Sequence, residues 1–469
     1  MTRNRLIWTF VVTSVAAFMG SLDNLVVTMA LPSIRENLHA GLSGLEWTVN
    51  AYTLTFAVFL LTGAALGDRF GRRRVFTAGL AVFTLASAAA ALAPNVDMLV
   101  AARAIQGLGA ATILPLSMTI LSAAVPANRR GAALGIWGAV SGLGVAIGPV
   151  VGGAVVEGAA WQWIFWLNVP VGLLIIPAAW TKLTETHGPS RRLDLPGVVL
   201  ASAGLFGVVF GVVRGNTHGW TSSSVLSGLI LGGLLLVGFG LWERRTETPM
   251  LPLRFFANRT FTAVNIASIL FSFGMFGAIF LLAQSLQIVQ HYSPLQAGIR
   301  TLPWTGMPIL LAPIVGPLAD RIGGRPLIAG GLAMMAAGLG WLTLVLSPTA
   351  SYASMVPAFV LAGAGMSMFF VPVGTVVLGA VRRDEQGVAS GANNAIREVG
   401  GVFGVAVLSS IFASGGSYAT AQSFMDGLKP AVAVGAVVVA LGAIVALAIR
   451  RQRPEPEVDE VPELELEMA

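Results

Sequence analysis

Cysteine is absent from this chain of 469 residues, which excludes disulfides, thiol catalysis and thiolate metal sites. Charge is also scarce, because 11% of the residues are charged, whereas a soluble domain has about 25%. The four histidines are scattered and no HExxH-type spacing occurs, so the sequence predicts no metal site. Apolar residues make up 55% of the chain, and its mean hydropathy is +0.79. This composition is typical of an integral membrane protein.

Apolar windows of about 20 residues recur along the chain, each long enough to cross a bilayer as a helix. Polar turns separate these windows, which lie at 8–31, 46–66, 75–93, 98–122, 131–156, 162–181, 195–213, 223–242, 260–283, 298–318, 327–346, 354–379, 387–413 and 430–449. The sequence therefore predicts an all-α polytopic membrane protein with fourteen transmembrane helices.

The basic residues indicate the orientation of these spans. Most of the 28 Lys and Arg residues fall in loops on the side of the N-terminus, and the loops on the other side hold only Arg35, Arg214, Arg300 and Lys429. Cytoplasmic loops carry the excess of Lys and Arg, so both termini are expected in the cytoplasm. The net charge of +6 belongs to these short clusters, which predict a lipid bilayer as partner and no nucleic acid.

An internal repeat divides the chain. The segment GAALGDRFGRRR (63–74) follows the second span and resembles GPLADRIGGRPL (316–327) after the tenth. The two copies are equivalent if two extra helices separate two six-helix bundles. We expect an N-terminal bundle at 1–183, two linker helices at 184–256, a C-terminal bundle at 257–453 and a disordered acidic cytoplasmic tail at 454–469.

Charged residues inside the spans are expensive and mark functional sites. Asp23 and Glu398 each interrupt an apolar span, one near each end of the sequence. Arg103 lies inside the fourth span, where we expect it to face the bundle interior and contact a carboxylate or backbone oxygens. Arg397 precedes Glu398 by one position, so the two should project about 100° apart and form no facing pair. Structural ion pairs with arginine are the alternative for both acids.

Six motifs in order carry a family resemblance: SLDNLVVTMALPSI (21–34), GDRFGRRR (67–74), RAIQGLGAA (103–111), GVAIGPVVGG (144–153), WQWIFWLNVPVG (161–172) and NNAIREVGGVFG (393–404). Together they resemble the major facilitator superfamily, and within it the fourteen-span drug:proton antiporters. The resemblance implies the major-facilitator fold, with two six-helix bundles and two extra central helices. It also implies transport by alternating access, without a cofactor, driven by a proton gradient.

The resemblance assigns roles to several residues. It implies that Asp23, Glu398 and Arg103 couple protons to the substrate, and that a gate at the turns of the repeat uses Asp68, Arg69, Arg72, Asp320 and Arg321. The glycine motif typical of antiporters spans Gly144, Gly148, Pro149, Gly152 and Gly153, and its four-residue spacing predicts a close-packed helix face. Candidate residues of the substrate cavity are Asn24, Gln106, Phe273, Phe276, Asn393, Asn394 and Arg397.

The first-helix motif departs from the family at Leu25 and Thr28, where Thr and Asn are usual. This departure leaves Asp23 in place but keeps open which side chains of that helix face the substrate. We expect a monomeric proton-coupled antiporter in a bacterial inner membrane, exporting amphipathic or cationic small molecules such as antibiotics. A dedicated exporter of one endogenous metabolite or lipid precursor is the alternative, followed by a proton-coupled nutrient symporter. An enzyme is disfavoured, because no nucleophile or metal constellation is present.

Overall fold

The computed structural model describes residues 3–126, 129–188, 194–382 and 385–450, and the predicted acidic tail at 454–469 lies outside this part of the chain. Within these ranges the regular elements are helices, and fourteen of them are long and apolar enough to cross a membrane. Each predicted span corresponds to one of the fourteen. The chain is therefore a polytopic all-α membrane protein, as the sequence predicts.

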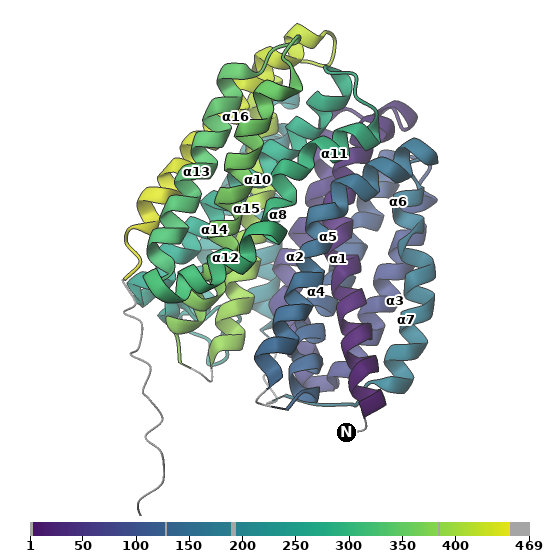
Figure 1. Cartoon of the computed structure of the whole chain (residues 1–469), viewed down its shortest axis with the longest axis vertical. Coiled ribbons are helices and arrows are strands. Elements are labelled where there is room, and N and C mark those ends of the chain that lie inside the picture. The colour runs from purple at the N-terminus through teal and green to yellow at the C-terminus, as the bar shows by residue number, and fades with distance from the viewer. Residues whose placement is uncertain (1–2, 127–128, 189–193, 383–384, 451–469) are drawn as a thin grey trace, which may run out of the picture.

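Two helical bundles stand side by side (Figure 1). The N-terminal bundle consists of α1 (Arg3–Asn37), α2 (Leu42–Phe70), α3 (Arg72–Ala91), α4 (Val96–Ala124), α5 (Arg130–Gly158) and the pair α6 (Trp163–Trp166) and α7 (Asn168–Lys182). The C-terminal bundle follows the short 3-10 helix η2 (Leu253–Ala257) and consists of α10 (Arg259–Ile288), α11 (Pro294–Thr305), α12 (Met307–Ile322), α13 (Gly324–Val345), α14 (Tyr352–Gly379), α15 (Gln386–Gly415) and α16 (Ala421–Ala446).

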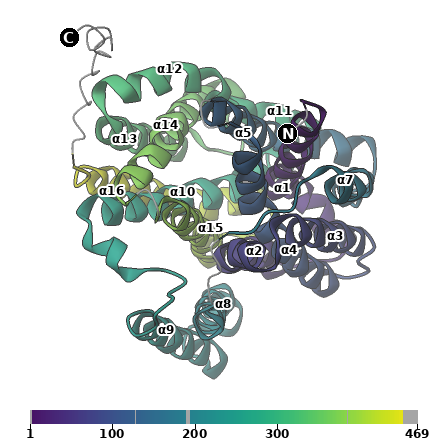
Figure 2. The same cartoon turned by 90° about the horizontal axis from the view of Figure 1, so that it is seen from below.

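Two linker helices, α8 (Leu195–His218) and α9 (Ser223–Glu243), lie beside the bundles (Figure 2). Helix α8 packs against α2 of one bundle and α15 of the other, and α9 packs on the outer side of α8. Val209 and Val213 of α8 share a buried apolar cluster with Leu54 of α2 and Val402 of α15. The linker therefore covers one seam between the bundles.

Polar side chains fix several helix starts by accepting backbone N–H groups that have no intrahelical partner. Asn95 accepts the Met98 amide at α4 over 2.9 Å, Asp194 accepts the Gly197 amide at α8 over 2.9 Å, and Asn258 accepts the Thr260 amide at α10 over 2.9 Å. These caps lie where apolar spans begin.

The repeat found in the sequence has a structural counterpart. Gly71 ends α2 with φ = 104° and Gly323 ends α12 with φ = 81°, each three residues after the Asp of its copy. A positive φ is a conformation that glycine adopts without a steric cost. The same sharp turn therefore closes the equivalent helix of each bundle.

Several boundaries differ from the sequence prediction. The first and last spans begin earlier, at Arg3 and Ala421, because polar residues at both sites are still helical. The span predicted at 298–318 is two helices that meet at Gly306, with Pro303 and Pro308 on either side. Proline interrupts the helical hydrogen bonding, which explains this break.

We call the end of the molecule where α1 begins and α16 ends the termini face, and the other end the opposite face. Helix α5 packs extensively against α11 near the opposite face and only slightly against α12 toward the termini face. Along α12, Leu310 and Ile314 are exposed, and so are Ile136 and Leu143 in the first half of α5. The bundles thus meet near the opposite face and diverge toward the termini face (Figure 1).

Candidate functional site

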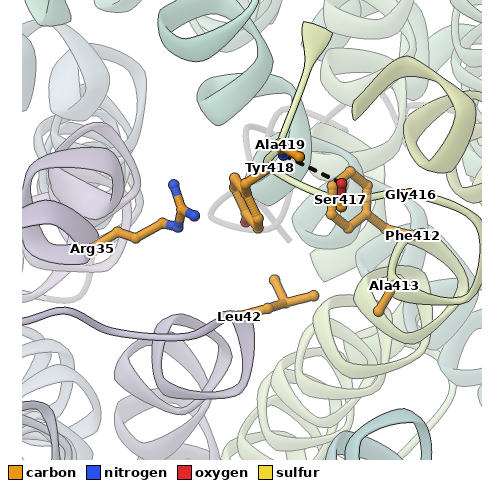
Figure 3. Close-up of a pocket in the computed structure, with 8 residues that line it drawn as sticks. All are labelled: Arg35, Leu42, Phe412, Ala413, Gly416, Ser417, Tyr418 and Ala419. Carbon is orange, nitrogen blue, oxygen red and sulfur yellow. Dashed lines mark hydrogen bonds between the residues drawn. The ribbon is translucent and has the colours of Figure 1, made fainter. Parts of the chain in front are cut away.

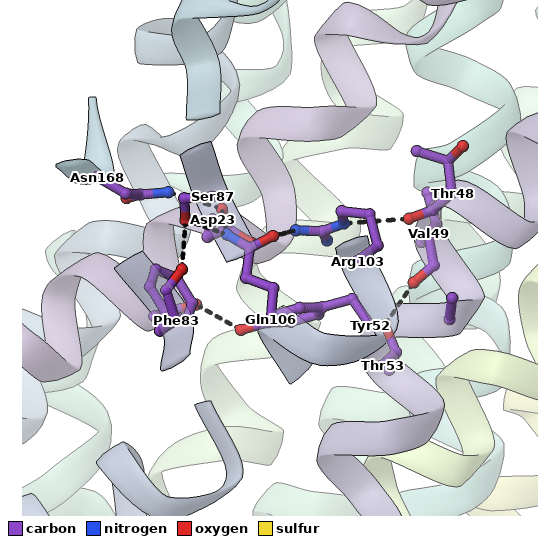
Figure 4. Close-up of polar contacts among 12 residues, drawn as sticks. Asp23, Thr48, Val49, Tyr52, Thr53, Phe83, Ser87, Arg103, Gln106 and Asn168 are labelled. Carbon is purple, nitrogen blue, oxygen red and sulfur yellow. Dashed lines mark hydrogen bonds and ion pairs between the residues drawn. The ribbon is translucent and has the colours of Figure 1, made fainter. Parts of the chain in front are cut away.

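Asp23 lies at the centre of the N-terminal bundle and is 1% exposed. Three side chains surround its carboxylate (Figure 4). Arg103 of α4 forms a short ion pair with Oδ2. Gln106 and Asn168 donate to Oδ1 over 2.8 and 3.0 Å. A buried charge is tolerated only when it is paired and hydrogen-bonded, and Asp23 meets both conditions.

Arg103 is also held by several groups at once. Beyond Asp23, its Nη1 donates to Gln106 Oε1 over 2.7 Å, and its Nε donates to the Thr48 carbonyl over 3.2 Å. Its guanidinium carbon lies 4.2 Å from the centre of the Tyr52 ring. The sequence prediction that Arg103 faces the bundle interior and meets a carboxylate agrees with this geometry.

Three residues of this network were not predicted from the sequence: Asn168, Ser87 and Tyr52. Ser87 accepts a hydrogen bond from Gln106 Nε2 over 2.8 Å, and the Tyr52 hydroxyl donates to the Gly20 carbonyl over 3.2 Å. Asn168 stands inside the motif at 161–172 as a polar residue at the start of α7. That position was the available signal for it, whereas Ser87 and Tyr52 are common in membrane helices.

Glu398 occupies the C-terminal bundle and is 4% exposed. Its Oε1 accepts from Arg397 Nη2 over 3.3 Å, and its Oε2 has no hydrogen-bond partner among the described residues. The sequence predicts that Arg397 and Glu398 are not a facing pair on the helix, but the long arginine side chain still reaches the carboxylate of its neighbour. Arg397 also lies 5.1 Å from the centre of the Phe370 ring and is 22% exposed at its side chain.

The remaining cavity candidates have different surroundings. Asn393 is buried and donates to Asn265 Oδ1 and Ser268 Oγ of α10, both over 3.0 Å, so it connects two helices of its own bundle. Asn24 and Asn394 are half-buried. Phe273 and Phe276 pack partly buried against the larger apolar core.

The glycines of the α5 motif pack against two different neighbours. Gly144, Gly148 and Gly152 face α1, where a β-carbon at Gly152 would come 2.5 Å from the Val26 carbonyl oxygen. The predicted single face does not include Gly153. It turns toward the other bundle, where its β-carbon would lie 2.2 Å from the Pro294 carbonyl oxygen.

The Pro149 carbonyl oxygen lies on the same contact between the bundles. A β-carbon at Gly298 of α11 would come 2.2 Å from it. The Thr305 hydroxyl adds a hydrogen bond to the Ala146 carbonyl over 2.9 Å. Helices α5 and α11 therefore approach almost backbone to backbone, as small residues permit in membranes.

The gate candidates lie at the termini face. Asp68 binds Arg72 at 2.8 Å across the α2–α3 turn, and its backbone carbonyl accepts the Gly188 amide over 3.2 Å. Arg69 lies over the neighbouring Phe70 ring. Asp320 and Arg321 are exposed at the end of α12 and form no ion pair within the described ranges. Among the described residues, the gate candidates make no polar contact between bundles in this conformation.

Neither of the two departures from the family motif, Leu25 and Thr28, lies on a solvent-exposed surface. Leu25 is 2% exposed and packs against Gly148, and Thr28 is 3% exposed with its hydroxyl donating to the Leu25 carbonyl over 2.6 Å. Both side chains therefore pack inside the protein.

A family model described as Major Facilitator Superfamily matches residues 13–405 and 264–466. The chain belongs to the major facilitator superfamily. It is accordingly a multi-pass membrane transporter and not an enzyme. This superfamily membership accounts for the paired bundles and the repeated Asp-Arg turn.

Similar proteins include several with names that refer to drug resistance or export. The multidrug resistance protein Stp of Mycobacterium tuberculosis is 37% identical over 417 residues, which cover 88% of this chain and 77% of Stp. The cephamycin export protein CmcT of Amycolatopsis lactamdurans is 37% identical and covers 94% of this chain and 92% of its own. The tetracenomycin C resistance and export protein of Streptomyces glaucescens is 35% identical, covering 87% and 76%.

Solved structures support the fold. A bacterial homolog of the human lysosomal transporter Spinster has a TM-score of 0.69 at 15% identity and covers 97% of this chain and 100% of its own. The xylose transporter XylE from E. coli has a TM-score of 0.63 at 15% identity, covering 94% and 95%.

Proposed function

We propose that this transporter is a proton-coupled antiporter that exports amphipathic or cationic small molecules, antibiotics among them, from a bacterial cytoplasm across the inner membrane. The names of its relatives support the substrate class, because they include multidrug resistance and antibiotic export proteins. The observation that carries the coupling is the presence of a fully buried carboxylate, Asp23, in one bundle and a half-satisfied one, Glu398, in the other.

The orientation follows from the basic residues. Their excess in the loops of the termini face supports a cytoplasmic location for that face. The bundles diverge at that face, so the conformation is the inward-open one of a rocker switch. Substrate enters from the cytoplasm, and the bundles then close there and separate at the opposite face.

The two carboxylates have different parts in this cycle. Glu398 has one oxygen without a hydrogen-bond partner among the described residues, and this oxygen is able to take a proton or the ammonium group of a cationic substrate. Competition between the two ligands for one carboxylate produces antiport. Asp23 holds a proton only when Arg103, Gln106 and Asn168 rearrange around it, which ties its protonation to movement of α1 against α4.

An exporter of a single compound is the second candidate. The names of the relatives refer to both kinds of exporter, since Stp is a multidrug resistance protein and CmcT exports cephamycin. A resistance profile against many unrelated compounds, compared with one restricted to a single compound, separates the two candidates.

The test is ethidium transport by inverted vesicles under an imposed pH gradient. Asp23→Asn and Glu398→Gln should abolish gradient-driven transport at equal amounts of folded protein. Asp426→Asn, which changes an exposed acid of α16, serves as the matched control and should transport normally. Gradient-driven transport that survives both central substitutions would refute the proposed coupling.

A further inference from the structure

A third carboxyl, Glu46 of α2, is buried in the membrane region and takes no part in the network around Asp23. It is 3% exposed, and its Oε2 has no hydrogen-bond partner among the described residues. One turn along the same helix face, the Asn50 side chain is 0% exposed, and both its Oδ1 and Nδ2 are also unpartnered. Most buried polar groups in proteins are hydrogen-bonded, so two such neighbours are unusual.

Glu46 lies beneath the seam between the bundles at the opposite face. A pocket of about 400 Å³ opens there between Arg35 of α1, Leu42 of α2 and the segment of the C-terminal bundle from Phe412 to Ala419 (Figure 3). Leu42 precedes Glu46 by four residues, so both lie on one face of α2, and Glu46 is one turn deeper. Tyr418, which belongs to the other bundle, lines the same pocket.

Contacts between the bundles close this region in the present conformation. The Arg35 guanidinium carbon lies 4.1 Å from the centre of the Tyr418 ring, and Gln287 Nε2 of α10 donates to the Met29 carbonyl of α1 over 3.1 Å. On the other side of the seam, Glu157 accepts hydrogen bonds from Ser293 and from the Leu295 amide. When the bundles separate at the opposite face, these contacts break and water reaches Glu46.

We propose that Glu46 is a proton site that controls closing of the opposite half of the transport pathway. This inference rests on the proposed function and adds a residue to it. An ionised carboxylate without a partner is far more costly to bury than the neutral acid. The open state therefore holds Glu46 as the carboxylate, and closing requires one proton from the solution at the opposite face, which gives the neutral carboxyl.

Nearby titratable and charged groups among the described residues do not pair with Glu46. Burial raises the pKa of Tyr418, so its phenol stays neutral, and its hydroxyl donates to Gln284 over 2.7 Å. Four charged groups on the elements that pack around α2 are engaged elsewhere: Asp23 with Arg103, Glu398 with Arg397, Arg214 over Phe210, and Arg35 over Tyr418. Glu36 of α1 and Asp97 of α4 are exposed to solvent.

In an exporter this site has a direct consequence. After the substrate leaves at the opposite face, protons from the more acidic outer solution neutralise Glu46 and favour closing. The return to the inward-open conformation then speeds up as the outer solution becomes more acidic. A shift of one pH unit on the steep part of the titration changes the open-to-closed ratio by about tenfold.

The test measures opening of the opposite face by pulsed electron paramagnetic resonance in nanodiscs. The chain has no cysteine, so spin labels at Met98→Cys in α4 and Gln422→Cys in α16 report the distance between the bundles without background. Between about pH 5 and pH 9, a range that covers ordinary and buried glutamates, the intact protein should shift from short to long distances as pH rises. Glu46→Gln should stay at short distances throughout.

Two further variants complete the test. Glu46→Asp keeps a titratable group and should keep the pH response, which shows that a loss in Glu46→Gln is not misfolding. Glu36→Gln, an exposed acid at the end of α1, should behave as the intact protein does. The inference is overturned if Glu46→Gln titrates like the intact protein, or if the intact protein shows no pH response. Ethidium transport by the intact protein, measured in parallel, tests the proposed function separately.

Discussion

The backbone of Gly153 lies directly against the backbone of Pro294, with room for hydrogen only, where α5 of one bundle meets α11 of the other. A β-carbon at Gly153 would come 2.2 Å from the Pro294 carbonyl oxygen, which is far inside contact distance. In this conformation the bundles meet at the opposite face, and the contact at Gly153 is part of that closed seam.

Replacing Gly153 with valine should therefore hinder closing of the opposite face. Overpacking a tight contact costs about 1–3 kcal/mol, which lowers the closed population roughly 5–150-fold. We expect ethidium transport to fall by at least about fivefold while the protein still folds. Gly158→Val at the end of the same helix is the control, because a β-carbon there would meet no neighbouring atom within 4 Å. This variant should transport normally. Equal activity of the two variants would contradict this role.

The pair Asp23–Arg103 predicts a non-additive effect on stability. Removing one partner of a buried ion pair leaves an uncompensated charge and costs about 3–5 kcal/mol. Arg103→Gln alone should lower the unfolding temperature strongly, whereas the double variant Asp23→Asn with Arg103→Gln should recover much of the loss. Thermal unfolding in detergent measures both.

The partly exposed pair Arg254–Glu385 offers the control for this experiment. Its atoms are 2.6 Å apart, but the Arg254 side chain is 68% exposed. Arg254→Gln should change the free energy of unfolding by less than about 1 kcal/mol, because water screens the pair. Losses that simply add in the double variant at Asp23 and Arg103 would count against a coupled buried pair.

Asn168 should matter for transport although the sequence did not predict it. Its Nδ2 donates to Asp23 Oδ1 over 3.0 Å, and a hydrogen bond to a charged group is worth about 1.5–3 kcal/mol. Asn168→Ala should reduce proton-driven transport by about tenfold or more. Asn37→Ala at the exposed end of α1 should have no effect. Normal transport by Asn168→Ala would remove this residue from the site.

Arg397 should set the preference for charged substrates. It is partly exposed and binds one oxygen of Glu398 over 3.3 Å. A partly exposed pair is worth up to about 1 kcal/mol, so Arg397→Gln should lower KM for a cationic dye by up to about fivefold. KM for an uncharged substrate should change little. A parallel change for both substrates would show that Arg397 acts through packing instead.

Much of the fold follows from the sequence, because a long apolar run has few alternatives to a membrane-spanning helix. The repeat at 63–74 and 316–327 indicated two extra helices between the halves of the sequence, and in the structure α8 and α9 lie beside the bundles. The break at Gly306 was missed, although prolines on both sides were visible. Helix α2 begins at Leu42 and not at 46, so Glu46 lies a full turn inside the helix. Because Glu46 stood at the predicted end of a span, the sequence did not indicate that it is buried.

The charged residues of the site could be predicted from the sequence, because charge is rare in apolar spans. Arg103 and Asp23 stand out in apolar spans, and each is the other's partner. Neutral polar residues such as Ser87 and Asn168 carry no comparable signal, because serine and asparagine also occur in packing roles. The pairing of Arg397 with Glu398 depends on side-chain reach, which helical spacing alone does not determine.

The most direct test of proton-coupled export is proton movement driven by substrate. Purified protein in liposomes with a pH indicator inside receives a gradient of ethidium and no pH gradient. Antiport predicts that protons move against the direction of ethidium, and that Glu398→Gln stops both movements. Ethidium flux without proton movement, or proton movement in the same direction as ethidium, would contradict the account.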